Sequence, residues 1–206
     1  MPFAMTMTCV LSLVLFSGCA TTEDSSSPSE LKPTSEIVSE APSDKFPAMA
    51  RVGGCDIVYR NGKMILSTPT NDRSLVQTKE SYKPPFALHL KAKTDTKNIR
   101  LYYNAGMIIL GWECKPSELR FHNPLNDRVT AYPRVGAIQP NTYYDIVWEM
   151  YPDGLRFLVN GKEAFRKSGE YGMLTAPVGI GPAFGSVVTV ESFSINELQG
   201  TLEERK

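Results

Sequence analysis

The stretch from residue 143 to 165, YYDIVWEMYPDGLRFLVNGKEAF, constrains the fold of this chain more than any other. Apolar and polar side chains alternate through residues 143–151, and Trp148 shares its face with Ile146 and Met150, which predicts a core position for this tryptophan. A Pro-Asp-Gly turn at 152–154 and an Asn-Gly turn at 160–161 then reverse the chain twice. Asn and Gly favour tight hairpins because they tolerate the positive φ that such turns require. The stretch therefore predicts an antiparallel meander.

The same pattern continues through most of the chain from residue 47 onward. Residues 55–59 and 64–67 flank an Asn-Gly turn, and residues 86–93 and 98–103 alternate cleanly. In the last apolar run, 187–195, the apolar residues change from even positions (Val188, Val190) to odd positions (Phe193, Ile195). This change predicts a bulge near Glu191 and Ser192. No amphipathic helix of any length is indicated. About a dozen short strands separated by frequent turns predict an all-β fold, a two-sheet antiparallel sandwich.

The N-terminal segment has the character of an export signal. Residues 10–16 form an apolar core that is too short to span a bilayer but has the length of a signal-peptide core. The run Phe16-Ser17-Gly18-Cys19 resembles a bacterial lipobox, although Phe16 stands where Leu is usual and no Lys or Arg precedes the apolar run. The resemblance implies a signal peptide at 1–18 and lipidation of Cys19. An ordinary cleaved signal and a buried strand are the alternatives.

A composition change separates this segment from the rest of the chain. Residues 20–46 are rich in Ser, Thr, Pro and acids, carry a net charge of −4, and lack the apolar surface that a packed core needs. We therefore predict that 19–46 is a disordered tether, that 47–197 is the folded domain and that 198–206 is a charged C-terminal tail. The domain and tail carry a net charge of +4 without a basic cluster, which argues against nucleic acid as a partner.

The predicted strand order resembles a known architecture, the concanavalin A-like lectin/glucanase jelly roll in its laminin-G-like bacterial form. The residues that carry the resemblance are the run 144–149, YDIVWE, the run 153–161, DGLRFLVNG, and the closing strand at 188–195. The segments 99–103, IRLYY, and 111–113, GWE, are similar to bacterial domains of this fold that accompany polysaccharide-degrading systems. The resemblance implies a jelly-roll sandwich with one concave sheet whose outer face can bind sugars.

Sugar binding needs aromatic rings for the apolar faces of pyranoses and fixed polar groups for their hydroxyls. The candidate positions, taken from the polar face of each predicted strand and from the two tryptophans, are His89, Lys91, Arg100, Tyr102, Arg120, His122, Arg156, Trp112 and Trp148. The same alternation is found in any solvent-facing sheet, so a face without a ligand is the alternative.

Catalysis would need two carboxyl groups on one sugar. Glu113 and Glu149, each preceded by Trp, are the candidates for a glycoside hydrolase, which needs its two carboxyl groups about 5–9.5 Å apart. The Glu-x-Asp-x-x-Glu spacing of glucanases of this fold is absent, and this favours a protein without catalysis. No cofactor is predicted, although Asn126, Asp127 and Asp153 are candidate calcium ligands.

Cys55 and Cys114 could form a disulfide or remain two separate thiols, since sequence cannot place their Cα atoms within bridging distance.

The sequence thus predicts a lipoprotein of the bacterial cell envelope, anchored in the outer membrane if the host is Gram-negative, because Ala20 and not Asp follows Cys19. Its predicted role is non-catalytic binding of a polysaccharide or oligosaccharide. A glycoside-acting hydrolase and a protein-interaction scaffold remain as alternatives.

Overall fold

The computed structural model describes residues 44–68, 74–96 and 98–205, and within these ranges it contains strands and turns but no α-helix. It follows that none of the described segments is a helix of the length and apolarity needed to cross a membrane. The predicted signal peptide, Cys19 and nearly all of the predicted tether lie outside the described residues. Phe46 was assigned to the tether, but its side chain is only 5% exposed and belongs to the hydrophobic core.

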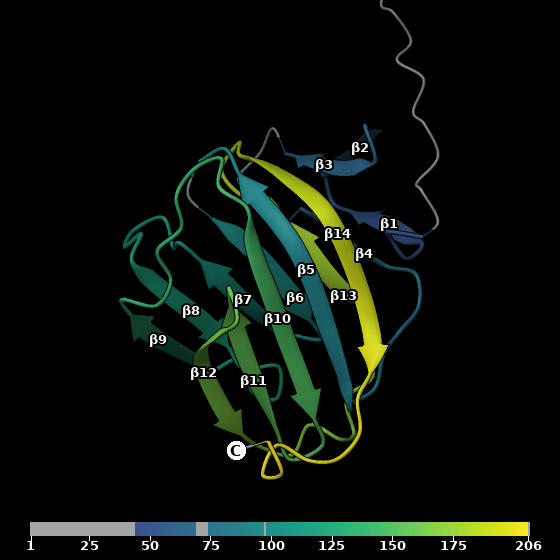
Figure 1. Cartoon of the computed structure of the whole chain (residues 1–206), viewed down its shortest axis with the longest axis vertical. Coiled ribbons are helices and arrows are strands. Elements are labelled where there is room, and N and C mark those ends of the chain that lie inside the picture. Colours follow the sequence, from purple (N-terminus) through teal and green to yellow (C-terminus); the bar gives the residue numbers. More distant parts are fainter. Residues whose placement is uncertain (1–43, 69–73, 97, 206) are drawn as a thin grey trace, which may run out of the picture. The chain divides into compact units, whose positions relative to one another are not determined.

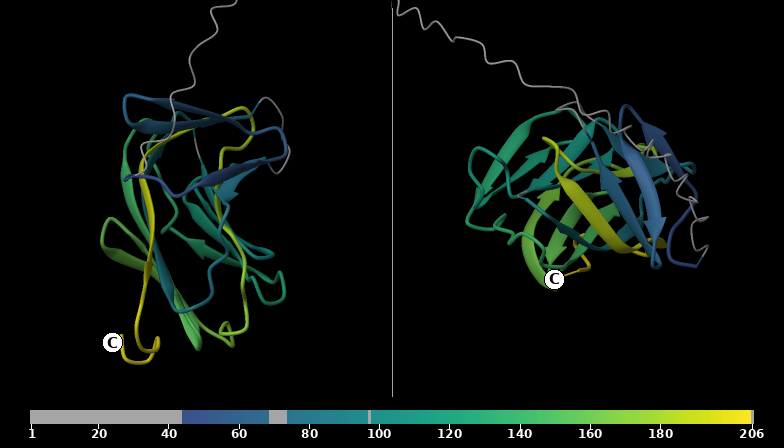
Figure 2. Two further views of the ribbon diagram at one scale, coloured as in Figure 1. Left: turned by 90° about the vertical axis from the view of Figure 1, so that its right-hand side faces the viewer. Right: turned by 90° about the horizontal axis from the view of Figure 1, so that it is seen from above.

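Two antiparallel sheets make up the domain (Figure 1). Sheet A has the order β1 (Met49–Val52), β4 (Leu75–Thr78), β13 (Val178–Gly181), β6 (Ile99–Tyr103), β7 (Gly106–Leu110), β8 (Glu118–His122) and β9 (Val129–Pro133). Sheet B has the order β12 (Lys162–Ser168), β11 (Gly154–Val159), β10 (Tyr144–Tyr151), β5 (Phe86–Thr94), β14 (Val187–Glu197), β3 (Lys63–Ser67) and β2 (Asp56–Arg60). The turned views show the sheets as two stacked layers (Figure 2). The predicted two-sheet jelly roll is confirmed.

The hairpins form at the predicted turns. Strands β10, β11 and β12 pair consecutively, as the meander predicted. The turn residues Asn160 and Gly161 have φ of 51° and 74°, the left-handed conformation that this residue pair tolerates. The predicted bulge is also present, because the register of β14 against β5 shifts between Val190 and Ser192. Glu191 is the extra residue.

The core lies between the two sheets and is rich in aromatic rings. Trp148 of β10 is 1% exposed and meets Tyr103 of β6 edge to face, with ring centroids 6.3 Å apart, which confirms its predicted core position. On the side where β9 and β12 form the sheet edges, the Phe165 ring contacts Tyr132, Phe121 and Phe157. These contacts join β12 and β11 of sheet B to β8 and β9 of sheet A.

Two strands of sheet A, β1 and β9, were not predicted, and both are edge strands. The run that forms β9 ends in Pro133, and a proline in a short run argues against a strand except at a sheet edge, where its missing N–H costs no ladder bond. The stretch up to Pro140 is also rich in turn residues, so its sequence shows no clear strand signal. Residues 129–133 form a strand because they pair with β8.

The predicted charged C-terminal tail is partly packed against the domain. The Leu202 side chain is 4% exposed, and its N–H donates a hydrogen bond of 2.8 Å to the Asp153 carboxylate in the β10–β11 turn. Gly154 permits this contact, because a Cβ there would lie 2.3 Å from a Leu202 methyl carbon.

Candidate functional site on the outer face of sheet A

Strand pairing brings four of the predicted binding residues together on the outer face of sheet A. In each of these strands the alternate residues, such as Leu101 and Phe121, point into the core. The register gives two neighbouring cross-strand rows, Arg100–Ile109–Arg120 and Tyr102–Met107–His122. The candidates of β6 and β8 therefore lie on one surface, separated by the apolar side chains of β7.

A polar cluster lies at the end of this surface, where β7 has just ended. Glu113 accepts a hydrogen bond of 2.9 Å from an Arg100 Nη atom and one of 3.1 Å from the Asn98 amide. The Arg100 side chain is 8% exposed and the Glu113 side chain 25% exposed, so this ion pair is partly shielded from water. Both contacts fix Glu113 against β6 and leave two further polar atoms of the cluster, Asn98 Oδ1 and Arg100 Nε, buried without a hydrogen-bond partner among the described residues.

Trp112 and Arg120 form a stacked pair beside this cluster. The guanidinium carbon of Arg120 lies 3.3 Å from the Trp112 ring centroid, which is cation–π geometry. Arg120 Nε also donates a hydrogen bond of 2.9 Å to Glu118, whose other oxygen lies 3.8 Å from the Lys115 ammonium. At the C-terminal end of β8, His122 Nδ1 lies 3.3 Å from the Asp127 carboxylate. Arg120 and His122 are thus each held in place by a neighbouring carboxylate.

A cavity of about 240 Å³ opens beside the polar cluster and is lined by Thr96, Asn98, Glu113, Ala183 and Phe184. Phe184 is 49% exposed although it is a large apolar side chain, and its ring lies 5.0 Å from the Arg100 guanidinium carbon. Its backbone φ of 53° is rare for a residue other than Gly, Asn or Asp. The cavity therefore combines an exposed aromatic face with fixed polar groups.

Phe184 and Asn98 are not among the site residues predicted from the sequence. Phe184 lies in the run Gly-Pro-Ala-Phe-Gly, where an aromatic side chain among turn residues has no strand face on which to be buried. That pattern could have indicated an exposed ring. Asn98 precedes β6 directly, and no feature of the sequence shows that its amide turns toward Glu113.

Three of the remaining candidates, His89, Lys91 and Arg156, lie on the outer face of sheet B, whereas Trp148 of the same sheet faces the core. His89 is on β5 and Arg156 is on β11. Arg156 forms a two-pronged ion pair with Glu149 of β10, with nitrogen–oxygen distances of 2.8 and 2.9 Å, and this hydrogen bonding raises the pKa of Arg156. Glu149 also accepts a hydrogen bond of 3.0 Å from the Tyr151 hydroxyl.

The two proposed catalytic carboxylates are therefore not brought together. Glu113 lies against the outer face of sheet A and Glu149 on the outer face of sheet B, with the hydrophobic core between them. Stacked sheets are about 10 Å apart, and both side chains point away from the core. The separation thus exceeds the roughly 5–9.5 Å that a glycosidase needs, and these two residues cannot flank one glycosidic bond.

The two cysteines are not joined to each other, and the candidate calcium ligands do not form a cluster. Cys55 and Cys114 are free thiols, the first buried and the second exposed, so the disulfide considered from sequence is not formed. Burial raises the pKa of Cys55 to about 11. Among the described residues no cluster of three or more His, Cys, Asp or Glu side chains has the arrangement of a metal site. Asp127 faces His122, and Asp153 is bound to the Leu202 N–H.

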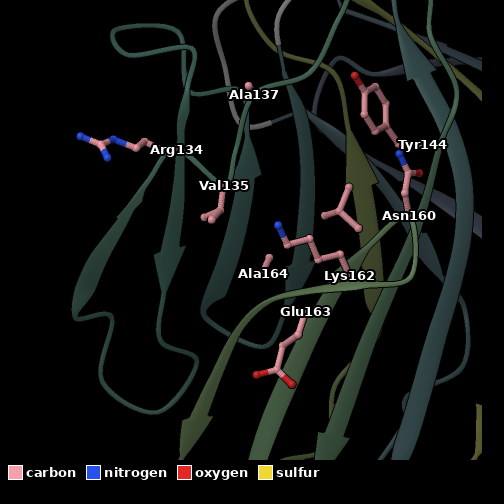
Figure 3. A pocket seen from close by; sticks show the side chains of 9 residues that line it. Arg134, Val135, Ala137, Tyr144, Asn160, Lys162, Glu163 and Ala164 are labelled. Carbon is pink, nitrogen blue, oxygen red and sulfur yellow. The ribbon is translucent and has the colours of Figure 1, made fainter.

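A second hollow of about 230 Å³ lies at the β9–β12 side of the sandwich, between residues 134–137 and the β11–β12 hairpin (Figure 3). Lys162 points into the space beneath Val135 and Ala137, whereas Arg134 and Glu163 point away from it. The Glu163 carboxylate is bound by Arg166, and the Tyr144 hydroxyl accepts a hydrogen bond from the Gln139 N–H. This hollow contains none of the residues predicted from sequence.

The fold is that of the concanavalin A-like jelly rolls, and solved structures with a similar fold include a carbohydrate-binding module and β-glucanases. The carbohydrate-binding module CBM66 from Bacillus subtilis is similar with a TM-score of 0.58 and 10% identity, covering 73% of this chain and 96% of that one. A β-glucanase from Bacillus licheniformis gives 0.55 at 8% identity, covering 73% and 92%. A lichenase from a mouse hindgut metagenome gives 0.52 at 12%, covering 72% and 92%. No protein-family model and no curated protein matches the sequence.

Proposed function

We propose that this domain binds a carbohydrate without cleaving it, and that the binding site is the outer face of sheet A from Phe184 to Trp112. Structures with the same fold include a carbohydrate-binding module and two glucanases, which supports a glycan as the ligand. Because these similarities are at 8–12% identity, the proposal depends on the site itself.

The observation that carries the proposal is the cavity beside Phe184. An exposed ring can stack on the apolar face of a pyranose, and the Asn98 and Glu113 side chains on the cavity wall can bind its hydroxyls. The volume is below the roughly 300–1,000 Å³ of sites for drug-sized ligands, so it fits one sugar ring. The stacked Trp112–Arg120 pair then offers a neighbouring contact for the next sugar of a chain.

The carboxylates of this face favour binding over hydrolysis. Glu113 is held by Arg100 and Asn98, and Glu118 is held by Arg120. A glycosidase needs one carboxyl group that donates a proton to the leaving oxygen and a second that attacks or activates water. Neither Glu113 nor Glu118 is free of a basic partner, and Glu149 is on the opposite face.

A glycan array with the full-length chain, with and without calcium, tests the proposal, and mass spectrometry of the incubated glycans tests for cleavage. We expect binding without new products. Phe184→Ala should weaken binding at least about fivefold, because aromatic anchors at binding sites contribute more than about 1 kcal/mol. Met173→Ala removes an even more exposed apolar side chain outside the site and should have no effect.

New products would show that the domain is an enzyme. An array without any binding would exclude a glycan site and favour the alternative, a sandwich that binds a protein partner.

The location of the domain is part of the same proposal. A lipid on Cys19 would anchor the chain in the bacterial envelope, and a flexible tether would hold the glycan site away from the membrane surface. Cys19→Ser should then move the protein from the membrane fraction to the soluble fraction of the producing cells. An unchanged distribution between the two fractions would exclude lipidation as the anchor.

A further inference from the structure

The outer face of sheet B carries a cluster of lysines around one tyrosine. Tyr143 precedes β10, and three ammonium groups lie within 6.0 Å of its ring centroid: Lys63 at 5.0 Å, Lys93 at 5.2 Å and Lys91 at 6.0 Å. The Lys63 ammonium also donates a hydrogen bond of 3.0 Å to the Tyr143 hydroxyl. Strands β3 and β5 supply the lysines, so the cluster exists only in the folded sheet.

The cluster has more positive than negative charge. Glu191, the bulged residue of β14, forms an ion pair of 3.1 Å with Lys91. Across the described residues, Lys63 and Lys93 have no carboxylate within ion-pair distance. Like charges held this close repel one another, and the repulsion is relieved when an anion binds among them. The Tyr143 hydrogen bond raises the pKa of Lys63, so this side chain remains charged at neutral pH.

A small hollow of about 100 Å³ adjoins the cluster. It is lined by Leu90, Ile146 and Val147 and by four polar residues, His89, Lys91, Asp145 and Ser192, and it lies beside the β14 bulge. The polar side chains can exchange hydrogen bonds with hydroxyl groups. The surface thus places cations next to neutral and acidic hydrogen-bonding groups.

We propose that this face, with Lys63, Lys93 and Tyr143 at its centre, is a second binding site that takes the sulfate or carboxylate groups of an acidic polysaccharide. The site is separate from the outer face of sheet A, so it does not depend on the function proposed there. A polysaccharide fits better than a membrane surface, because the large apolar side chains exposed on the described residues (Leu125, Val129, Val135, Met173 and Phe184) are on other parts of the domain. Insertion into a lipid interface needs such side chains.

Dextran sulfate, carboxymethyl dextran and neutral dextran, each immobilised, test the proposal with the full-length chain. We expect binding to one or both charged dextrans and none to the neutral one, weakening as salt increases. The double variant Lys63→Gln/Lys93→Gln should lose at least about tenfold in affinity, since charge-assisted contacts are the stronger hydrogen bonds. The preferred charged dextran identifies the anionic group.

The control is Lys79→Gln/Lys83→Gln, which removes the same charge from two exposed lysines in the β4–β5 connection. An equal loss in both double variants would overturn the proposal, because it would show a general charge effect. Binding to phosphatidylglycerol vesicles but not to the charged dextrans would overturn it in favour of a membrane. Phe184→Ala should leave this binding unchanged, which separates this proposal from the site on sheet A. A thermal melt of each variant shows that the domain is folded.

Discussion

The Phe165 side chain is the most informative position for testing how the two sheets are held together. It lies on β12, one of the two edge strands of sheet B, and is 5% exposed. Its ring stacks on Tyr132 at 4.5 Å and contacts Phe121 at 5.1 Å and Phe157 at 5.6 Å. Two of these three partners belong to sheet A. Phe165→Ala would therefore remove contacts across the sandwich without breaking the strand pairing of β12.

The expected decrease in the free energy of unfolding of Phe165→Ala follows from these contacts. Truncation of a buried Phe to Ala costs about 3–5 kcal/mol, through lost burial and the cavity that remains. Because an edge strand can move inward to fill part of the cavity, we expect the lower end, about 3 kcal/mol. For a domain of this size, about 2–4 °C is lost per kcal/mol, so the melting temperature should fall by about 6–12 °C.

Urea unfolding followed by tryptophan fluorescence measures this change, since Trp148 lies in the core. Phe184→Ala is the matched control, because the same atoms are removed from a ring that is 49% exposed, and its free energy of unfolding should change by less than about 0.5 kcal/mol. A loss below about 1 kcal/mol for Phe165→Ala would refute the reasoning, because it would mean that the aromatic contacts between the sheets add little to stability.

Three further results are expected. Gly161→Val should lower the free energy of unfolding by about 1–2 kcal/mol in the same urea assay. The backbone φ is 74° at this position, and a β-branched residue is strained at positive φ even though its Cβ would meet no other atom. An unchanged urea midpoint would show that the turn adapts. Iodoacetamide at pH 8 should label the exposed Cys114 of the native chain and not Cys55, because the Cys55 thiol is buried and its pKa is raised to about 11. Peptide mass spectrometry measures the labelling. Equal labelling of both cysteines would place Cys55 at the surface. Burial raises the pKa of Tyr171 to about 12, so the stability that its neutral hydroxyl contributes is fully present below about pH 10 and is lost as the pH rises toward 12. Urea midpoints should therefore fall over this interval, and Tyr171→Phe should reduce that decrease. Midpoints that stay constant would contradict the burial of the Tyr171 hydroxyl.

The sequence by itself determined the local structure of this chain. Hairpins form at Asn61-Gly62 and Asn160-Gly161 because few other residue pairs accept the left-handed φ values found there. Alternation assigned Trp148 to the core, and the parity change near Glu191 gave the bulge. Each of these features depends on neighbours within a few residues, and this is why the pattern of residues alone is sufficient. The count of short strands then restricted the fold to a sandwich.

Only the tertiary structure decided which strands lie in which sheet. Arg100 and Arg120 share a face because β7 lies between β6 and β8. Glu113 and Glu149 are separated because Glu113 follows β7 of sheet A, whereas Glu149 lies on β10 of sheet B. The cluster around Tyr143 likewise depends on pairing between β3, β14 and β5. Alternation places a side chain on one of two faces of its own strand, but it contains no information about the neighbouring strand. The candidate sites are assembled from residues far apart in the sequence, so their composition is fixed only when the sheets form.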